Sequence, residues 1–150
     1  KLHQRFDLDL VVVGGQEADL IAEELAEAGI PVVLPALAAH GDRLGAERTL
    51  ARRFMTLTEA GVDVALASGG GDGSQALLML RAGELVAAGA DADEVWDALT
   101  RVPAEILGLD GERGTLAAGA AADLLLFEGS SPFDASAPMR VFTAHNGFDR

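Results

Sequence analysis

The sequence offers few residues that could do chemistry by themselves. Its three histidines, His3, His40 and His145, lie far apart in the chain. No H-x-H or H-E-x-x-H spacing brings two imidazoles to one metal ion. Cysteine is absent, which removes thiolate ligands and a cysteine nucleophile, and no serine lies in a G-x-S-x-G elbow. The residues alone therefore predict no metal site made by this chain.

A glycine-rich segment, Gly69-Gly70-Gly71-Asp72-Gly73-Ser74, lies between an expected strand and an expected helix. Backbone N–H groups at such a junction can bind a phosphate or carboxylate. The segment lacks the Gly-Lys-Ser/Thr of a P-loop and does not follow the G-x-G-x-x-G register. An ordinary loop is therefore favoured, and an anion site remains the alternative.

The remaining polar and aromatic candidates are more typical of structural roles. The local positive patch consists of Arg43, Arg48, Arg52 and Arg53. We predict that it forms a solvated helix face rather than an anion clamp. The single tryptophan, Trp96, is expected to pack against a neighbouring layer, and Asp123 to cap or tie a turn.

Strand and helix patterns alternate along the first half of the chain. Short apolar runs at 8–13, 30–34 and 62–67 are typical of buried strands. Helical spacing of apolar residues occupies about 17–28 and 47–60, and a glycine ends each helix. This alternation predicts an α/β fold with a parallel sheet, either doubly wound or part of a (β/α)₈ barrel.

The second half is expected to be helical and then β-rich. One helix follows the glycine-rich segment, and a further one carries apolar residues from Val95 to Ile106. Pro103 interrupts that helix, so we expect a bend or restart there, and Gly108 is expected to end it. Strands are predicted at 122–127 and 139–144, the latter being the last, and together they should form a separate small layer.

Composition narrows the class of protein. The 150 residues include 24 acidic and 11 basic side chains, a formal net charge of −13, which excludes a basic nucleic-acid binder. No apolar run approaches the roughly 18 residues that span a bilayer, so a soluble protein with no membrane partner is expected, either cytoplasmic or exported. The chain begins with Lys1 rather than Met, so it is expected to be a trimmed, mature or partial chain.

Several motifs near the end of the sequence occur together in one known family. They are Leu99-Thr-Arg-Val-Pro-Ala-Glu-Ile-Leu-Gly-Leu109, Gly114-Thr-Leu-Ala-Ala-Gly-Ala-Ala-Ala-Asp-Leu-Leu-Leu-Phe127, Ser131-Pro132 and the segment 141–147. This arrangement, over about residues 95–147, resembles the C-terminal end of the amidohydrolase superfamily. Imidazolonepropionase-like and prolidase-like members are the nearest.

The resemblance implies a particular fold. The three strands would be the sixth, seventh and eighth of a (β/α)₈ barrel within residues 1–110, and residues 111–150 would belong to a small β-sandwich. A complete barrel needs about 250 residues. The chain therefore resembles the C-terminal half of such a protein, without the first five strands and the family's H-x-H pair and bridging lysine. Its open edges should pair with the missing half or with another copy in a homo-oligomer.

The resemblance also implies a reaction class, which is metal-assisted hydrolysis of C–N bonds in cyclic amides, amidines or peptides. The family places a histidine after the sixth strand and an aspartate after the eighth, where this chain has Gly14 and Gly69. Neither glycine can bind a metal or move a proton. Asp72 is the candidate catalytic substitute, and Ser68 and His40 are candidate substrate-binding residues. A divalent metal such as zinc is expected only in a full-length protein.

Two other functions stay open. The chain could be a non-catalytic pseudoenzyme that serves as a scaffold or as a small-ligand-binding module, which the glycines at positions 14 and 69 favour. It could also be a flavodoxin-like domain that binds an anion through residues 69–74. The β-rich tail argues against that last reading, since a doubly wound fold does not require it.

Overall fold

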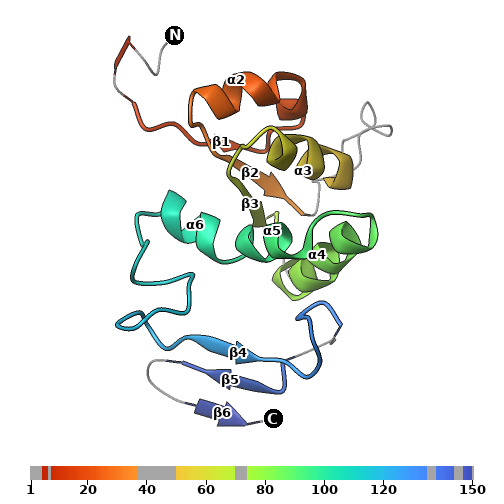
Figure 1. The fold of residues 1–150 in the computed structure, drawn as a ribbon, viewed down its shortest axis with the longest axis vertical. Coiled ribbons are helices and arrows are strands. Elements are labelled where there is room, and N and C mark those ends of the chain that lie inside the picture. Colours follow the sequence, from red (N-terminus) through yellow and green to blue (C-terminus); the bar gives the residue numbers. More distant parts are fainter. Residues whose placement is uncertain are drawn as a thin grey trace.

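Two small sheets, one parallel and one antiparallel, lie on either side of a group of helices (Figure 1). The computed structural model describes residues 5–6, 8–36, 50–69, 74–134, 138–143 and 147–149. The first sheet contains β1 (Val12–Val13), β2 (Val32–Pro35) and β3 (Val64–Ala67), all parallel and in the order β1-β2-β3. The predicted α/β class with a parallel sheet is thus confirmed.

Helices follow each of these strands. They are η1 (Ala18–Ile21) and α2 (Ala22–Glu27) after β1, α3 (Leu50–Glu59) after β2, and η2 (Ser74–Leu77) and α4 (Leu78–Ala87) after β3. The first strand is shorter than the predicted 8–13. Its neighbour β2 begins at Val32, which lies opposite Val12, so residues before Val12 have no β2 residue to pair with. Residues 8–11 therefore precede the ladder and form no strand.

One face of the parallel sheet packs on the helices. The register places Val12, Val32 and Val64 side by side, and Leu34 lies next to Leu66 two residues on. Val32, Leu34, Val64 and Leu66 are buried together with Phe54 and Leu57 of α3 and with Ala82 and Leu85 of α4. This shared core explains why the strands are apolar and why the helices keep an apolar stripe.

The opposite face of the sheet is only partly covered. Val13 lies beside Val33, and its side chain is 76% exposed, whereas Val33 and Pro35 are half-buried. Burying an exposed valine side chain is worth about 1.5–3 kcal/mol, so this face remains a source of binding energy. The sheet is therefore built with helices on one face and with an apolar second face that the described residues do not fill.

The two edges of the parallel sheet differ. The backbone N–H of Leu66, which points away from β2, donates to the carbonyl of Ala98 at 2.9 Å, so the end of a helix covers part of the β3 edge. Within the described part of the chain, nothing pairs with the outer edge of β1. An open strand edge of this kind is a template for pairing with another strand.

The helical segment after α4 is divided in two, as predicted from Pro103. The first helix, α5 (Ala92–Asp97), is capped by Asp91, whose carboxylate accepts from two backbone N–H groups at 3.0 Å each. The second, α6 (Arg101–Ile106), contains Pro103 near its start, where a missing N–H is tolerated. Gly108 has a positive φ of 68° and follows the end of α6, as expected.

The loop after α6 lies tightly against that helix. A Cβ placed on Gly114 would lie 2.7 Å from the carbonyl oxygen of Thr100 and 2.8 Å from Cβ of Ala104, and the φ of Gly114 is +85°. Arg113 forms an ion pair with Asp123 across the same loop, which confirms that Asp123 ties a turn. The Thr-x-x-Pro-Ala and Gly-x-Leu motifs of the sequence therefore form one packed joint.

The tail forms the antiparallel sheet of β4 (Leu124–Leu126), β5 (Arg140–Phe142) and β6 (Gly147–Asp149), in the order β4-β5-β6. Its position away from β1–β3 is visible in Figure 1. The prediction that 139–144 is the last strand is wrong, because β6 follows it. None of the helices in the described ranges is long and apolar enough to cross a membrane.

Candidate functional site

The carboxyl ends of the three parallel strands form the candidate site. The N–H of Gly14 donates to the carbonyl of Val33 at 2.9 Å, and the N–H of Ala36 donates to that of Ala67 at 2.7 Å. These bonds continue the ladder to the points where β1, β2 and β3 give way to loops. In open and closed α/β sheets, ligands bind at this end of the strands.

Of the three predicted site residues, the structure places one. Ser68 comes directly after β3, is half-buried, and lies at the carboxyl end of the sheet. Its hydroxyl can both donate and accept a hydrogen bond. Asp72 and His40 lie outside the described residues, so their roles stay predictions.

The two glycines that follow β1 and β3, Gly14 and Gly69, have left-handed backbone. The φ angles are +96° for Gly14 and +88° for Gly69, a region that L side chains rarely adopt. For a residue with a Cβ, this conformation costs roughly 1–2 kcal/mol. A histidine or aspartate at either position would therefore require a change in the local backbone as well as in the side chain.

The described side chains do not fit a divalent metal at this edge. Among the residues that the structure covers, no group of three or more His, Cys, Asp and Glu side chains could hold a metal ion. Gly14 and Gly69 have no side chain to serve as a ligand, and the Ser68 hydroxyl is not one of the imidazole, thiolate and carboxylate ligands that metals such as zinc usually take. Any metal at this site would need ligands from residues outside the described part.

Sequence reasoning missed two buried polar residues. Ser74, the first residue of η2, is 7% exposed, and its hydroxyl oxygen has no hydrogen-bond partner among the described residues. Arg53 is 6% exposed, so the prediction of a solvated face is wrong for this residue. Its spacing gives the reason, since Arg53 lies three residues after Leu50 and four before Leu57, on the apolar side of α3. Arg52 is exposed as predicted, and Arg43 and Arg48 lie outside the described residues.

A shallow apolar cavity of about 370 Å³ lies beside the open edge of the sheet. It is formed by Val12 of β1, by Glu17 and by the apolar side of η1 and α2. Leu20 and Ile21, which line it, are 57% and 48% exposed. The cavity thus lies against β1, whose outer edge has no partner among the residues that the structure describes. We call the outer edge of β1, together with Leu20 and Ile21, the β1 edge surface.

Comparison with known proteins agrees with the resemblance in the sequence. A model described as the amidohydrolase family matches residues 3–144. An amidohydrolase from Thermotoga maritima is similar over 99% of this chain and 39% of its own, with 30% sequence identity and a TM-score of 0.85. A prolidase solved in complex with N-methylphosphonate-L-proline is similar over 94% of this chain and 40% of its own, with 21% identity and a TM-score of 0.74.

The chain thus spans about two fifths of the length of the solved structures that it matches. A second amidohydrolase structure has the same TM-score of 0.74 at 21% identity. A search of curated proteins gave no match.

Proposed function

Because this chain belongs to the amidohydrolase family, we propose that it supplies the C-terminal portion of an amidohydrolase-type hydrolase. The observation that carries the proposal is the parallel sheet itself. It has helices on one face, a partly exposed apolar second face, and an unpaired β1 edge. These are the features expected of an arc of a (β/α)₈ barrel, whose second face and edge are covered when the barrel closes.

In this proposal β1, β2 and β3 are the sixth, seventh and eighth strands of the barrel. Residues 1–110 would form the barrel segment, and residues 111–150 would add strands to a small β-sandwich. The partner would be a preceding half of the barrel, with a second copy of the chain as the alternative. Its strand would lie parallel to β1, and its next helix would fill the cavity lined by Leu20 and Ile21.

The reaction class that we propose is hydrolysis of C–N bonds in cyclic amides or peptides. A divalent metal such as zinc, held by residues outside the described part, would supply an activated water in such a reaction. This chain's own contribution would be to bind and orient the substrate. Ser68 would hydrogen-bond to a polar group of the substrate, with His40 lining the pocket and Asp72 as the candidate for proton transfer.

A non-catalytic scaffold is the second candidate, and a specific observation favours it. The left-handed backbone at Gly14 and Gly69 means that a histidine or aspartate at either position would be strained. In this alternative the chain would keep the barrel architecture and the ligand-binding edge while lacking the chemistry.

The first experiment is to isolate the natural protein from its source and measure its intact mass and metal content in one sample. A mass well above that of 150 residues, with about one or two metal ions bound per molecule, is expected for a working hydrolase. A natural protein of 150 residues without metal would refute the hydrolase proposal and support the scaffold.

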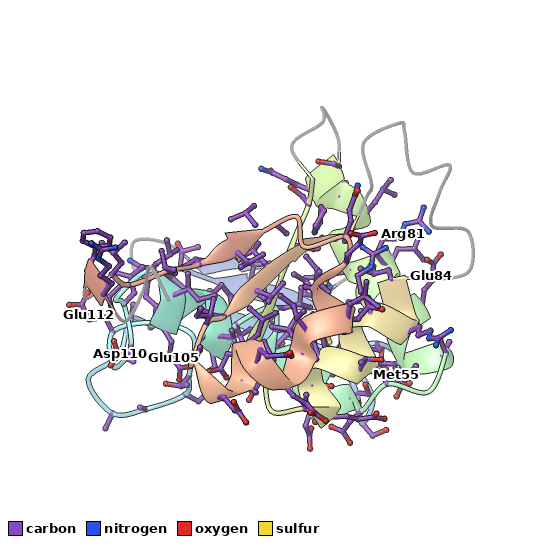
Figure 2. All side chains as sticks on the ribbon, turned by 90° about the horizontal axis from the view of Figure 1, so that it is seen from above. Met55, Arg81, Glu84, Glu105, Asp110 and Glu112 are labelled. Atoms are coloured by element: carbon purple, nitrogen blue, oxygen red, sulfur yellow. The ribbon has the colours of Figure 1, made fainter. Side chains whose placement is uncertain are left out.

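A second measurement tests the site residue. Hydrolysis of a panel of cyclic amides and of dipeptides with C-terminal proline is compared between the natural protein and its Ser68→Ala variant. We expect kcat/KM to fall about tenfold, the effect of losing roughly one hydrogen bond in a desolvated site. The control is Asp110→Asn, since Asp110 lies with Glu105 and Glu112 on one side of the molecule (Figure 2) and is exposed. An unchanged kcat/KM in Ser68→Ala would remove Ser68 from the site.

A further inference from the structure

A second cavity lies at the seam between α5 and the β-rich tail. Its volume is about 380 Å³, and its walls are Asp93 and Trp96 of α5, Phe127 directly after β4, and the turn at 129–132. Ser68 does not line it, and it shares no lining residue with the cavity beside β1.

The aromatic walls of this cavity meet at a right angle. The rings of Trp96 and Phe127 have centroids 6.2 Å apart and an interplanar angle of 87°. Phe133 packs against Trp96 at 6.2 Å and 77° but does not line the cavity, so it supports the indole. Edge-to-face packing is the usual contact of two aromatic rings, and here both rings also line the cavity. Alkylammonium groups bind over the faces of such rings.

The charge at this corner is negative. The exposed carboxylate of Asp93 lines the cavity, and in the described part of the chain no cationic side chain pairs with it. The whole chain carries a formal net charge of −13, which raises the local concentration of cations further. An anionic or purely apolar ligand would gain nothing from this carboxylate.

We propose that the cavity bounded by Trp96, Phe127 and Asp93 binds a small alkylammonium cation. The methyl groups of the cation lie against the two aromatic rings, and the carboxylate of Asp93 neutralises its charge. A free quaternary ammonium compound and a methylated lysine side chain of another protein both carry such a cation. We propose that the ligand is the free compound.

The test uses the intrinsic fluorescence of Trp96, which is the only tryptophan of the chain and therefore reports on this cavity alone. Choline is titrated against the whole chain at constant ionic strength and compared with its neutral carbon isostere 3,3-dimethylbutan-1-ol. We expect a saturable change with choline in the millimolar range and at least about fivefold weaker binding of the isostere. Equal binding of the two compounds, or no saturation with choline, would overturn the proposal.

Two matched variants distinguish the effect of the Asp93 carboxylate on choline binding from the effect of the chain's net charge. Asp93→Asn should weaken choline binding about fivefold, whereas Glu94→Gln should leave it within a factor of about two. Glu94 is a fitting control because it is an exposed acid on the same helical turn that does not line the cavity. Equal weakening in both variants would show that only net charge matters and would contradict the proposed site.

Two further measurements serve as controls. A peptide with one trimethyllysine is titrated in parallel with choline. Tighter binding of the peptide than of choline would show that the ligand is a side chain of a protein partner and would contradict the proposal of a free compound. Far-UV circular dichroism confirms that each variant is folded. Should a variant not fold, the comparison of choline with its isostere on the unaltered chain still decides the question.

Discussion

Replacing Gly114 with alanine tests the joint between α6 and the loop that follows it. Two costs add at this position. The φ of +85° costs a residue with a Cβ roughly 1–2 kcal/mol. The new Cβ would lie 2.7 Å from the carbonyl oxygen of Thr100 and 2.8 Å from Cβ of Ala104, which is overpacking of a kind that costs about 1–3 kcal/mol. We therefore expect Gly114→Ala to lower the free energy of unfolding by about 2–5 kcal/mol.

Gly111→Ala is the matched control for this variant. Gly111 lies in the same loop with a φ of +79°, but a Cβ there would meet nothing within 4 Å. Gly111→Ala should therefore lower the free energy of unfolding only by the cost of placing a Cβ in left-handed backbone, about 1–2 kcal/mol. The difference between the two variants isolates the steric contact with α6, which should be about 1–3 kcal/mol.

The assay is urea unfolding followed by the fluorescence of Trp96 and by far-UV circular dichroism. Coincident transitions in the two signals would justify a two-state analysis, and the midpoints would then give the free-energy differences. Equal losses for Gly111→Ala and Gly114→Ala would refute the reasoning, because they would mean that the loop does not press on α6.

Three further predictions concern stability. Phe54→Ala should cost about 3–5 kcal/mol in urea unfolding, because Phe54 is fully buried and its removal leaves a cavity. Asp91→Ala should cost about 1 kcal/mol and Asp91→Asn much less, since either oxygen-bearing side chain can cap α5, and a thermal melt would distinguish them. The pKa of Arg101 is raised by its hydrogen bonds to Glu105, at 2.9 Å, and to Asp97, at 2.8 Å. Because the pKa of Arg101 is higher in the folded state than in the unfolded chain, its ion pairs stabilise the fold fully at any pH below the unfolded-state pKa. This stabilisation is lost only as the pH rises through the folded-state pKa. The effect of Arg101→Ala, at most about 1 kcal/mol for these partly exposed pairs, should therefore be equal at pH 7 and pH 10 and smaller in about 1 M salt.

The sequence predicted the order of the elements because that order depends on periodicity. The three apolar runs, the helices between them and the break near Pro103 are local patterns, and each is present in the structure. The strands were predicted too long at their starts, because a strand requires a neighbour as well as an apolar run. Residues 8–11 are apolar enough for a strand, yet in the described part of the chain no strand lies opposite them.

The features that the sequence did not reveal depend on tertiary contacts. Residues 147–149 form β6 because they pair with β5, not because of any pattern of their own. The burial of Arg53 depends on which side of α3 faces the core. The left-handed backbone at Gly14 and Gly69 depends on how each strand end turns, so the glycines could be identified but their conformation could not.

The candidate site was predicted only through the family resemblance. Composition and spacing placed no chemistry at Ser68, and the family motifs lie far from it in the sequence. Those motifs proved to be packing residues, since Thr100, Ala104 and Gly114 form the joint of α6 with its loop. A family can thus be identified from residues that hold its architecture together rather than from residues that perform its reaction.

The covered edge of β3 limits how copies of this chain could assemble. A linear fibre grows only when each subunit has two complementary surfaces, one to receive the previous copy and one to receive the next. Here the N–H of Leu66 is already bonded to Ala98, so a strand added at β3 would have to displace the helix end first. Association through β1 alone is thereby directed toward a closed pair, and an exposed apolar strand is kept from seeding an open-ended polymer.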